Sequence, residues 1–308
     1  MAWRYGYRHP NWWRVRRSAK PVPREPDWGE PVDLGFDGKV ALVAGGSSGM
    51  GFAAARELAR EGAHVAIGAR GGEQLKQAVS QLEEVTGTNR ITATSVDVTD
   101  PEAARAWVTE VTDEFGGLHV MLVSGGSPPM GWASRFELTD YQAAVTQMLF
   151  PAIGLALAAV PHMRAASWGR LLFIASETAV HPVRSLVLSG VARSGLVRFV
   201  QGLAADVAPN GITVNVIAPG TVHTPPLMRA AARLAGPGAT DEEVAERLAA
   251  MGHHSAIGRL GKPEEIAAMI AFLASERASF ITGSVHLIDG GANLIGPDAP
   301  HLAPGIFS

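Results

Sequence analysis

Short apolar runs and longer amphipathic stretches alternate along the chain from Lys39 onward. The longer stretches carry apolar residues at helical spacing, as Leu75, Val79 and Leu82 do. Strands separated by helices of this length predict parallel βαβ units, and therefore an α/β fold with a doubly wound parallel sheet of the Rossmann type. The predicted strands cover residues 40–43, 65–67, 91–96, 119–123, 171–174, 212–217 and 285–288.

Composition divides the chain into three parts. We predict an irregular N-terminal arm over 1–37, a single Rossmann-type domain over 38–292 and a C-terminal tail over 293–308. The first 28 residues hold seven positive and two negative side chains and four of the seven tryptophans, without the apolar run of a signal peptide. An arm that binds a membrane surface or nucleic acid is one interpretation. The favoured one is an arm that packs on its own domain or on a partner subunit.

Two predicted helices, over 140–163 and 185–207, are apolar on nearly every face. A helix on the outside of a sheet ordinarily keeps one polar face, so we predict that a second copy covers them in a homodimer or homotetramer. The continuous apolar part of the first helix, 148–161, is too short to span a membrane, so a buried helix is predicted there. We predict a helical insertion over 225–255, with a polar middle at 236–240.

The overall composition narrows the function classes. Of 308 residues, 47% are hydrophobic and 18% charged, so the chain can bury a sizeable core. The net charge of −3 provides no general basic field for nucleic acid. The absence of cysteine excludes disulfides, thiolate metal ligands and a cysteine nucleophile, and it agrees with a cytoplasmic protein. His253 and His254 are adjacent but lack a third ligand, so no metal site is predicted.

A glycine-rich turn follows the first predicted strand. Glycines at such a turn let the backbone approach a pyrophosphate, which lies on the N-terminus of the following helix. A plain strand-to-helix turn is the alternative, but the turn's place at the start of the domain favours a dinucleotide site. Its residues are Gly45, Gly46, Ser47, Ser48, Gly49, Met50 and Gly51.

The spacing of Gly45, Gly49 and Gly51 resembles the cofactor motif of the short-chain dehydrogenase/reductase family, and later segments resemble that family's motifs in order. The resemblance, over about 38–292, implies a Rossmann-type domain, a nicotinamide cofactor and a dimer or tetramer. The further matching segments are Asp97-Val98, Ser176, 215–220 with Thr224, 258–265, 272–275, 282–283 and 289–291. Besides the glycine turn, the resemblance implies cofactor contacts at Asp97, Val98, Ser124, Gly125, Arg193, Pro219, Gly220, Val222 and Thr224.

The end of the second predicted strand indicates which nicotinamide cofactor binds. A carboxylate there would bind the ribose 2′-hydroxyl of NAD. In this chain Ala69 takes that position and Arg70 follows. A guanidinium can pair bidentately with a phosphate, so we predict NADP(H). The alternative is that Arg70 is an ordinary surface arginine.

The chain departs from the family at its catalytic positions. Counting from Ser176, the positions of the family's tyrosine and lysine hold Ser189 and Arg193, and the relay asparagine is replaced by Met148. The family's Asn-Asn-Ala-Gly segment reads Ser-Gly-Gly-Ser at 124–127. A serine hydroxyl is far too weak an acid to replace the phenol, and an arginine stays charged. Ser176, Ser189 and Arg193 are nevertheless the candidate catalytic residues, with Arg193 also able to hold a ribose hydroxyl.

Another side chain could supply the proton. Glu177, His181 and His223 are the candidate substitutes, although a solvated loop residue or a capped turn is the favoured interpretation of each. The loss of the tyrosine ring also enlarges the predicted cleft and favours a bulky, largely apolar small-molecule substrate. The insertion that would close over the cleft contains Leu227, Met228, Leu234, Leu248 and Met251.

Two functions follow. The first is an NADP(H)-dependent oxidoreductase that acts on a carbonyl or hydroxyl group with a non-standard proton transfer. The second is a protein that keeps the cofactor shell but performs a non-redox step, such as cyclisation or dehydration, or serves as an inactive partner. The cofactor motifs favour the first function, and the three changed relay positions favour the second.

Overall fold

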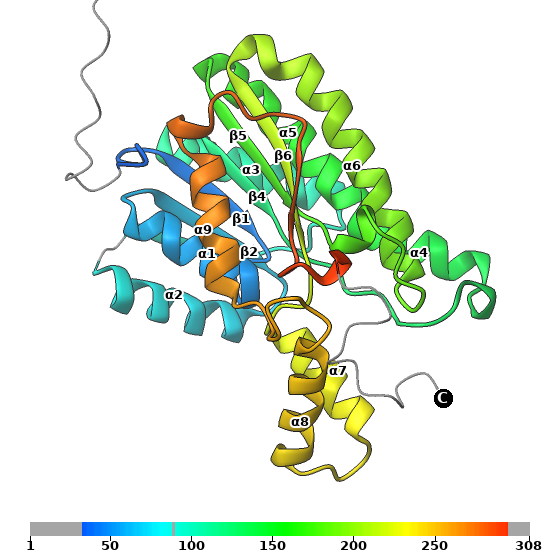
Figure 1. The fold of residues 1–308 in the computed structure, drawn as a ribbon. Coiled ribbons are helices and arrows are strands. Elements are labelled where there is room, and N and C mark those ends of the chain that lie inside the picture. Colours follow the sequence, from blue (N-terminus) through cyan, green and yellow to red (C-terminus); the bar gives the residue numbers. More distant parts are fainter. Residues whose placement is uncertain (1–32, 88–89, 295–308) are drawn as a thin grey trace, which may run out of the picture. The chain divides into compact units, whose positions relative to one another are not determined.

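Seven parallel strands form one sheet in the computed structural model, which describes residues 33–87 and 90–294 (Figure 1). The strand order is β3-β2-β1-β4-β5-β6-β7, so the direction of winding reverses between β1 and β4. All seven predicted strands are confirmed. Their bounds are β1 Val40–Ala44, β2 His64–Ala69, β3 Ile91–Ser95, β4 Val120–Val123, β5 Gly169–Ile174, β6 Ile212–Pro219 and β7 Val285–Ile288.

Helices cover both faces of this sheet. One core cluster joins the sheet to α1, α2 and α9, and a second joins it to α3, α5 and α6. Every residue of β1 is buried, as expected of a central strand with helices on both sides. The helices are α1 Gly49–Arg60, α2 Gly72–Thr86, α3 Pro101–Phe115, α4 Leu138–Met148, α5 Phe150–Ala166, α6 Val187–Val207, α7 Pro225–Ala235, α8 Asp241–Gly252 and α9 Pro263–Ala274.

The predicted single helix over 140–163 is wrong in one respect, because α4 and α5 are separate helices joined at Leu149. Pro151 lies at the start of α5 and has no N–H to continue the hydrogen bonding of α4. Taken together, Leu138–Ala166 is long and apolar enough to cross a membrane by length and composition alone. It packs instead as a core element, with Leu155 and Ala159 fully buried under the sheet.

The compact domain begins at Leu34, a few residues before the predicted boundary at 37/38. Phe36 is buried in the core, and its carbonyl accepts the N–H of Lys39 at 2.9 Å. The rest of the predicted arm lies outside the described residues, as does the tail after Leu294. Two tail residues that are described, Asn293 and Leu294, belong to the short helix η5 Ala292–Leu294.

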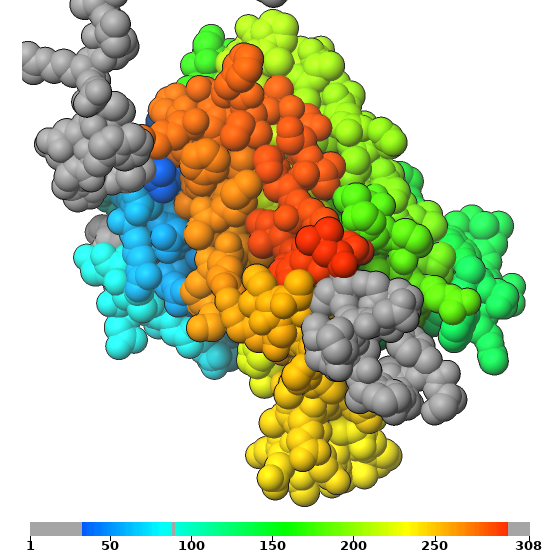
Figure 2. Space-filling model, viewed as in Figure 1, coloured from blue at the N-terminus to red at the C-terminus, as the bar shows by residue number. Residues whose placement is uncertain are grey.

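The predicted insertion over 225–255 is confirmed as two helices, α7 and α8, joined by residues 236–240. The pair stands out from the sheet layers in Figures 1 and 2, where it is yellow. Met228 and Leu234 on α7 are exposed. These side chains are therefore not core residues of the described domain, and they remain available to cover something else.

Candidate cofactor and catalytic site

The turn after β1 needs glycine because it passes close to other backbone. Gly45 has a φ of 78°, and a Cβ there would collide with the carbonyl oxygen of Ser124 at the end of β4. A Cβ on Gly51 would collide with the carbonyl oxygen of Gly45. These two approaches bring the start of α1 directly under the end of β1, at the point where the sheet reverses direction. Ligands of doubly wound sheets bind at this point.

The first turn of α1 is free to bind an anion. Its N-cap residue, Ser48, makes no side-chain capping hydrogen bond, so the side chain does not satisfy the first N–H groups of the helix. Gly49 has a φ of 59° and lies against Thr224, whose Cγ2 would be 3.5 Å from a Cβ on the glycine. Ser47 and Met50 flank this turn and are half-buried. We call the turn from Gly45 to Gly51 the glycine cradle. It fits a dinucleotide pyrophosphate, because side chains at its glycines would fill the space that the pyrophosphate needs beside the helix N-terminus.

Arg70 and Asp97 lie beside each other at the ends of β2 and β3. Asp97 accepts hydrogen bonds from the Thr99 backbone N–H at 3.0 Å and from its hydroxyl at 2.8 Å. These bonds hold the pKa of Asp97 below its usual value, and the positive charge of Arg70 adds to the effect. Arg70 is exposed, and Val98 packs partly against the core. The pair therefore offers a positive charge and a carboxylate at the adenosine end of a dinucleotide site.

The remaining predicted cofactor residues also gather at the carboxyl edge of the sheet. Ser124 donates its N–H to Ala44 at 2.9 Å, and Gly125 follows it. Pro219 ends β6, and the Gly220 N–H donates to Ile288 at the end of β7 at 3.0 Å. Val222 is buried and paired with Gly261. The structure thus places every predicted cofactor residue along this one edge.

The predicted catalytic serines are connected through a residue that the sequence analysis missed. The Thr178 backbone N–H donates to Ser176 Oγ at 3.3 Å, and Thr178 Oγ1 lies 3.2 Å from Ser189 Oγ. Thr178 belongs to the short helix η2 Glu177–Ala179, which packs against α6. The only feature of the sequence that could have pointed to Thr178 is its hydroxyl group two residues after Ser176. Ser176, Thr178 and Ser189 form a continuous polar path.

Arg193 is buried one helical turn after Ser189. Its Nη2 atom donates to the carbonyl oxygens of Gly125 and Gly126, the latter at 3.3 Å. Burial lowers the pKa of Arg193 to about 10, so the guanidinium remains charged at neutral pH. The hydrogen bonds of Arg193 therefore hold the loop after β4 in place, and its charge puts a positive potential beside the predicted ribose site.

Met148 lies on the opposite side of the same loop. Its side chain packs against Gly126, where a Cβ would collide with it, and it shares a small buried cluster with Leu188 and Ala192. Met148 therefore offers no hydrogen-bonding group to a water at this predicted relay position. Met148 and Arg193 both contact Gly126 and so lie at the same loop, while their correspondence with the family's relay residues stays a prediction.

The candidate proton donors differ in their surroundings. His181 is half-buried and donates its backbone N–H to the carbonyl oxygen of Glu177 at 2.9 Å. His223 is exposed and donates its backbone N–H to Gly261. Glu177 is half-buried, and its Oε2 lies 3.5 Å from Asn293 Nδ2. Glu177 is therefore partly buried and begins a short helix capped by Ser176, which agrees with the capped turn that the sequence offered as one interpretation.

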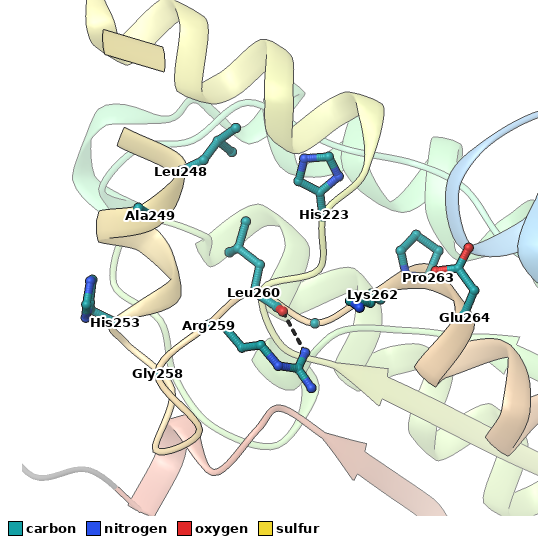
Figure 3. Close-up of a pocket in the computed structure, with 11 residues that line it drawn as sticks. His223, Leu248, Ala249, His253, Gly258, Arg259, Leu260, Lys262, Pro263 and Glu264 are labelled. Carbon is teal, nitrogen blue, oxygen red and sulfur yellow. Dashed lines mark hydrogen bonds between the residues drawn. The ribbon is translucent and has the colours of Figure 1, made fainter. Parts of the chain in front are cut away.

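A cavity of about 620 Å³ lies between the α7–α8 pair and the loop before α9 (Figure 3). His223, Leu248 and Leu260 face it from three different segments. Arg259 also lines the cavity and forms an ion pair with Glu265, in which Arg259 Nη2 lies 2.6 Å from Glu265 Oε1. Because His223 directly follows the cofactor segment at Val222, the cavity adjoins the predicted site. Within the described ranges, no three or more His, Cys, Asp or Glu side chains are grouped to hold a metal ion.

Comparisons with known proteins agree with this geometry. Residues 44–293 match the family model described as enoyl-(acyl carrier protein) reductase. The 3-oxoacyl-(acyl-carrier-protein) reductase FabG of Escherichia coli is 32% identical over 262 residues, which cover 85% of this chain and all of that protein. The chain belongs to the short-chain dehydrogenase/reductase family. Like its relatives, this family member is an oxidoreductase of the short-chain type.

Two further relatives show how varied the substrates of similar family members are. The cis-4-hydroxycyclohexanecarboxylate dehydrogenase of Sinomonas cyclohexanicum is 32% identical, over 83% of this chain and 97% of that protein. The crystal structure of L-sorbose reductase from Gluconobacter frateurii, in complex with NADPH and L-sorbose, superposes with a TM-score of 0.80 at 34% identity. That alignment covers 85% of this chain and 98% of the sorbose reductase.

Proposed function

We propose that the protein is a cytoplasmic NADP(H)-dependent oxidoreductase that interconverts a carbonyl and a hydroxyl group on a bulky, largely apolar small molecule. The observation that carries this proposal is the placement of Ser176, Thr178 and Ser189 at the same sheet edge as the glycine cradle. The sorbose reductase to which the chain is similar binds NADPH at 34% identity, which supports the choice of cofactor. The cavity between Leu248 and Leu260 supports an apolar substrate.

Each part of a bound dinucleotide would be held by a different group of residues. The α1 N-terminus, between Gly45 and Gly51, would hold the pyrophosphate, Arg70 the 2′-phosphate and Asp97 the adenine. Arg193 and the loop that it holds would border the nicotinamide ribose. When bound, the cofactor supplies or accepts the hydride.

At the reacting carbon, Ser176 orients the substrate oxygen. Its Oγ accepts only the Thr178 N–H among the hydrogen bonds of the described residues, so its own hydrogen is available to the substrate. Ser189 shares its hydroxyl with Thr178 and supports that arrangement. The buried charge of Arg193 stabilises negative charge that develops on the oxygen.

A non-redox reaction or an inactive binding role remains the second candidate. Two residues favour this second candidate. Met148 puts an apolar side chain at the predicted relay position, and the guanidinium of Arg193 donates its hydrogen bonds to backbone carbonyl oxygens. The two candidates differ in one assay, which follows NADPH absorbance with a panel of ketones beside a cofactor-binding titration. Consumption of NADPH supports the redox function, whereas binding without consumption supports the second candidate.

Arg70 is expected to set the preference for NADPH over NADH. Charge-assisted hydrogen bonds contribute about 1.5–3 kcal/mol, so Arg70→Ala should weaken NADPH binding by roughly ten- to a hundredfold and leave NADH binding nearly unchanged. Isothermal titration with both cofactors measures this. Arg105→Ala, an exposed arginine on α3, is the matched control. Equal affinities of the wild type for the two cofactors would refute the assignment.

Assembly through α5 and α6 is a further part of the proposal. Phe150 and Leu157 on α5 and Val191 on α6 are exposed in the single chain, with Leu157 57% accessible. In the family the equivalent helices pair with their copies across a two-fold axis. Such a pairing would cover these side chains.

Leu157→Asp is therefore expected to convert a homo-oligomer into monomers, because a charge would be buried in the interface. Val197, on the neighbouring helix α6, is not suitable for this test, because its side chain is 8% accessible and belongs to the core. Light scattering at micromolar concentration measures the mass. Leu234→Asp, on exposed α7, is the control that should leave the assembly intact. A monomeric wild type would overturn the prediction.

A further inference from the structure

Reduction of a carbonyl leaves a negative oxygen that needs a proton, and the positions of the family's phenol and lysine hold Ser189 and Arg193. We propose that Glu177 is the catalytic acid–base residue, which protonates the substrate oxygen during reduction and deprotonates the hydroxyl during oxidation. This inference rests on the proposed redox function. It assigns the proton-transfer role to the carboxyl group of the residue that directly follows Ser176.

The position of Glu177 is the first argument. It directly follows Ser176 as the chain leaves β5 and opens the short helix η2. Ser176 is the residue that would hold the substrate oxygen, and Glu177 is its direct neighbour in the chain. Glu177 and Thr178 both follow Ser176 in the loop after β5, one with a carboxyl group and the other with the link to Ser189.

The groups around the carboxyl are the second argument. Asn293 Nδ2 lies 3.5 Å from Glu177 Oε2 and donates to Asp289 Oδ2 at 2.8 Å. Asp289 ends the β7 segment and also accepts the backbone N–H groups of Gly291 and Asn293. Two carboxyl groups thus share one amide. His181, from the same loop as Glu177, is the nearby group of opposite charge.

These surroundings favour the protonated form of Glu177. Burial raises the pKa of Glu177 above its usual value, and the negative charge of Asp289 raises it further. The hydrogen bond from Asn293 and the charge of His181 act in the opposite direction and are smaller. A carboxyl group that holds its proton at higher pH is a more suitable acid than a serine hydroxyl near neutrality.

The step balances with NADPH as the reductant. The carbonyl carbon accepts the hydride from NADPH, which is oxidised to NADP⁺, and the carbonyl π pair forms an O–H bond with the proton of Glu177. The resulting carboxylate recovers a proton from solvent. Asn293 is exposed, and the last described residues, red in Figure 2, lie at the surface of the molecule, so solvent can reach this side of the carboxyl group.

Glu177→Gln tests the proposal directly, because it keeps the shape and removes the transferable proton. We expect kcat for ketone reduction to fall at least a hundredfold, with NADPH affinity within twofold of the wild type. Glu177→Ala should show the same loss and recover at least tenfold with added formate. Ser176→Ala should not recover with formate. Glu110→Gln, exposed on α3, is the control that should behave as the wild type.

The pH profile supplies a second readout that a purely structural role would not produce. Reduction requires the protonated acid, so kcat should fall as pH rises through the pKa of Glu177. Asp289→Asn removes a negative charge, lowers that pKa and moves the fall to lower pH. Asn293→Ala removes a hydrogen bond that favours the carboxylate and moves the fall to higher pH. Carbon-13 NMR titration of the Glu177 carboxyl, assigned by its loss in Glu177→Gln, should show the same shifts without turnover.

The outcomes separate this proposal from the proposed function. A wild type that reduces ketones, with a Glu177→Gln variant that is equally fast and has the same pH profile, overturns the role of Glu177 and leaves the redox function intact. A wild type that binds NADPH but reduces nothing overturns both. A variant that loses activity without formate rescue or shifted profiles shows a structural role and also rejects the proposal.

Discussion

Ser176→Ala is expected to lower kcat/KM at least tenfold, or about 1.4 kcal/mol of transition-state stabilisation, and to cost more than Ser189→Ala. Ser176 lies two residues after the end of β5 and has its hydroxyl hydrogen free for the substrate, whereas Ser189 shares its hydroxyl with Thr178 at 3.2 Å. Removing Ser189 therefore takes away a supporting contact. Removing Ser176 takes away the group that orients the reacting oxygen.

Steady-state kinetics with one ketone and saturating NADPH measure both variants, with Ser80→Ala on exposed α2 as the control. If the protein has abandoned the family's mechanism, Ser189→Ala should leave the rate nearly unchanged. If Ser189 also holds the substrate oxygen, its loss should cost at least tenfold. A larger loss for Ser189 than for Ser176 would show that the assumed correspondence of positions is incorrect.

Gly45→Ala is expected to weaken cofactor binding and to destabilise the fold. A methyl group there would collide with the Ser124 carbonyl oxygen, and the φ of 78° is itself unfavourable for alanine. Strain of this kind costs about 1–3 kcal/mol before the collision is added. We therefore expect the free energy of unfolding to fall by at least about 2 kcal/mol and NADPH affinity to fall more than tenfold.

Urea unfolding and a cofactor titration of the same samples measure the two effects. Gly72→Ala is the matched control, because a Cβ there meets nothing within 4 Å and the residue starts a helix. It should be neutral or slightly stabilising. A Gly45→Ala protein with wild-type stability and affinity would show that the turn is not packed against β4 as described.

Periodicity predicted the fold well because each parallel strand is a short buried run bounded by turn residues. Asp100 illustrates the local signals, since an aspartate directly before a proline is a typical helix start, and its carboxylate accepts the N–H of Glu102 at 2.9 Å at the beginning of α3. The break at Leu149 was not predicted, because Pro151 falls within an otherwise continuous apolar pattern. The burial of Phe36 was also missed, since its short segment has no period to analyse.

The site was predictable where its residues are consecutive and was not where distant segments meet. The consecutive residues of the glycine turn after β1 were enough to predict a cofactor site there, and that role stays a prediction. The meeting of Glu177 with Asp289 and Asn293 depends on the return of β7 alongside β6, which places residues far apart in sequence side by side. Thr178 was missed for a similar reason, because its partner on α6 is set by packing.

Hydride transfer is expected to survive without the family's phenol, and deuterium transfer from NADPH that carries deuterium at both C4 positions tests this most directly. The purified protein is incubated with the labelled cofactor and a bulky apolar ketone, and the product alcohol is analysed by mass spectrometry. We expect one deuterium at the carbinol carbon, in amounts equal to the NADP⁺ formed, and no transfer when the protein is omitted. Tight binding of the labelled cofactor, with no deuterium in any product across the ketone panel, would contradict it.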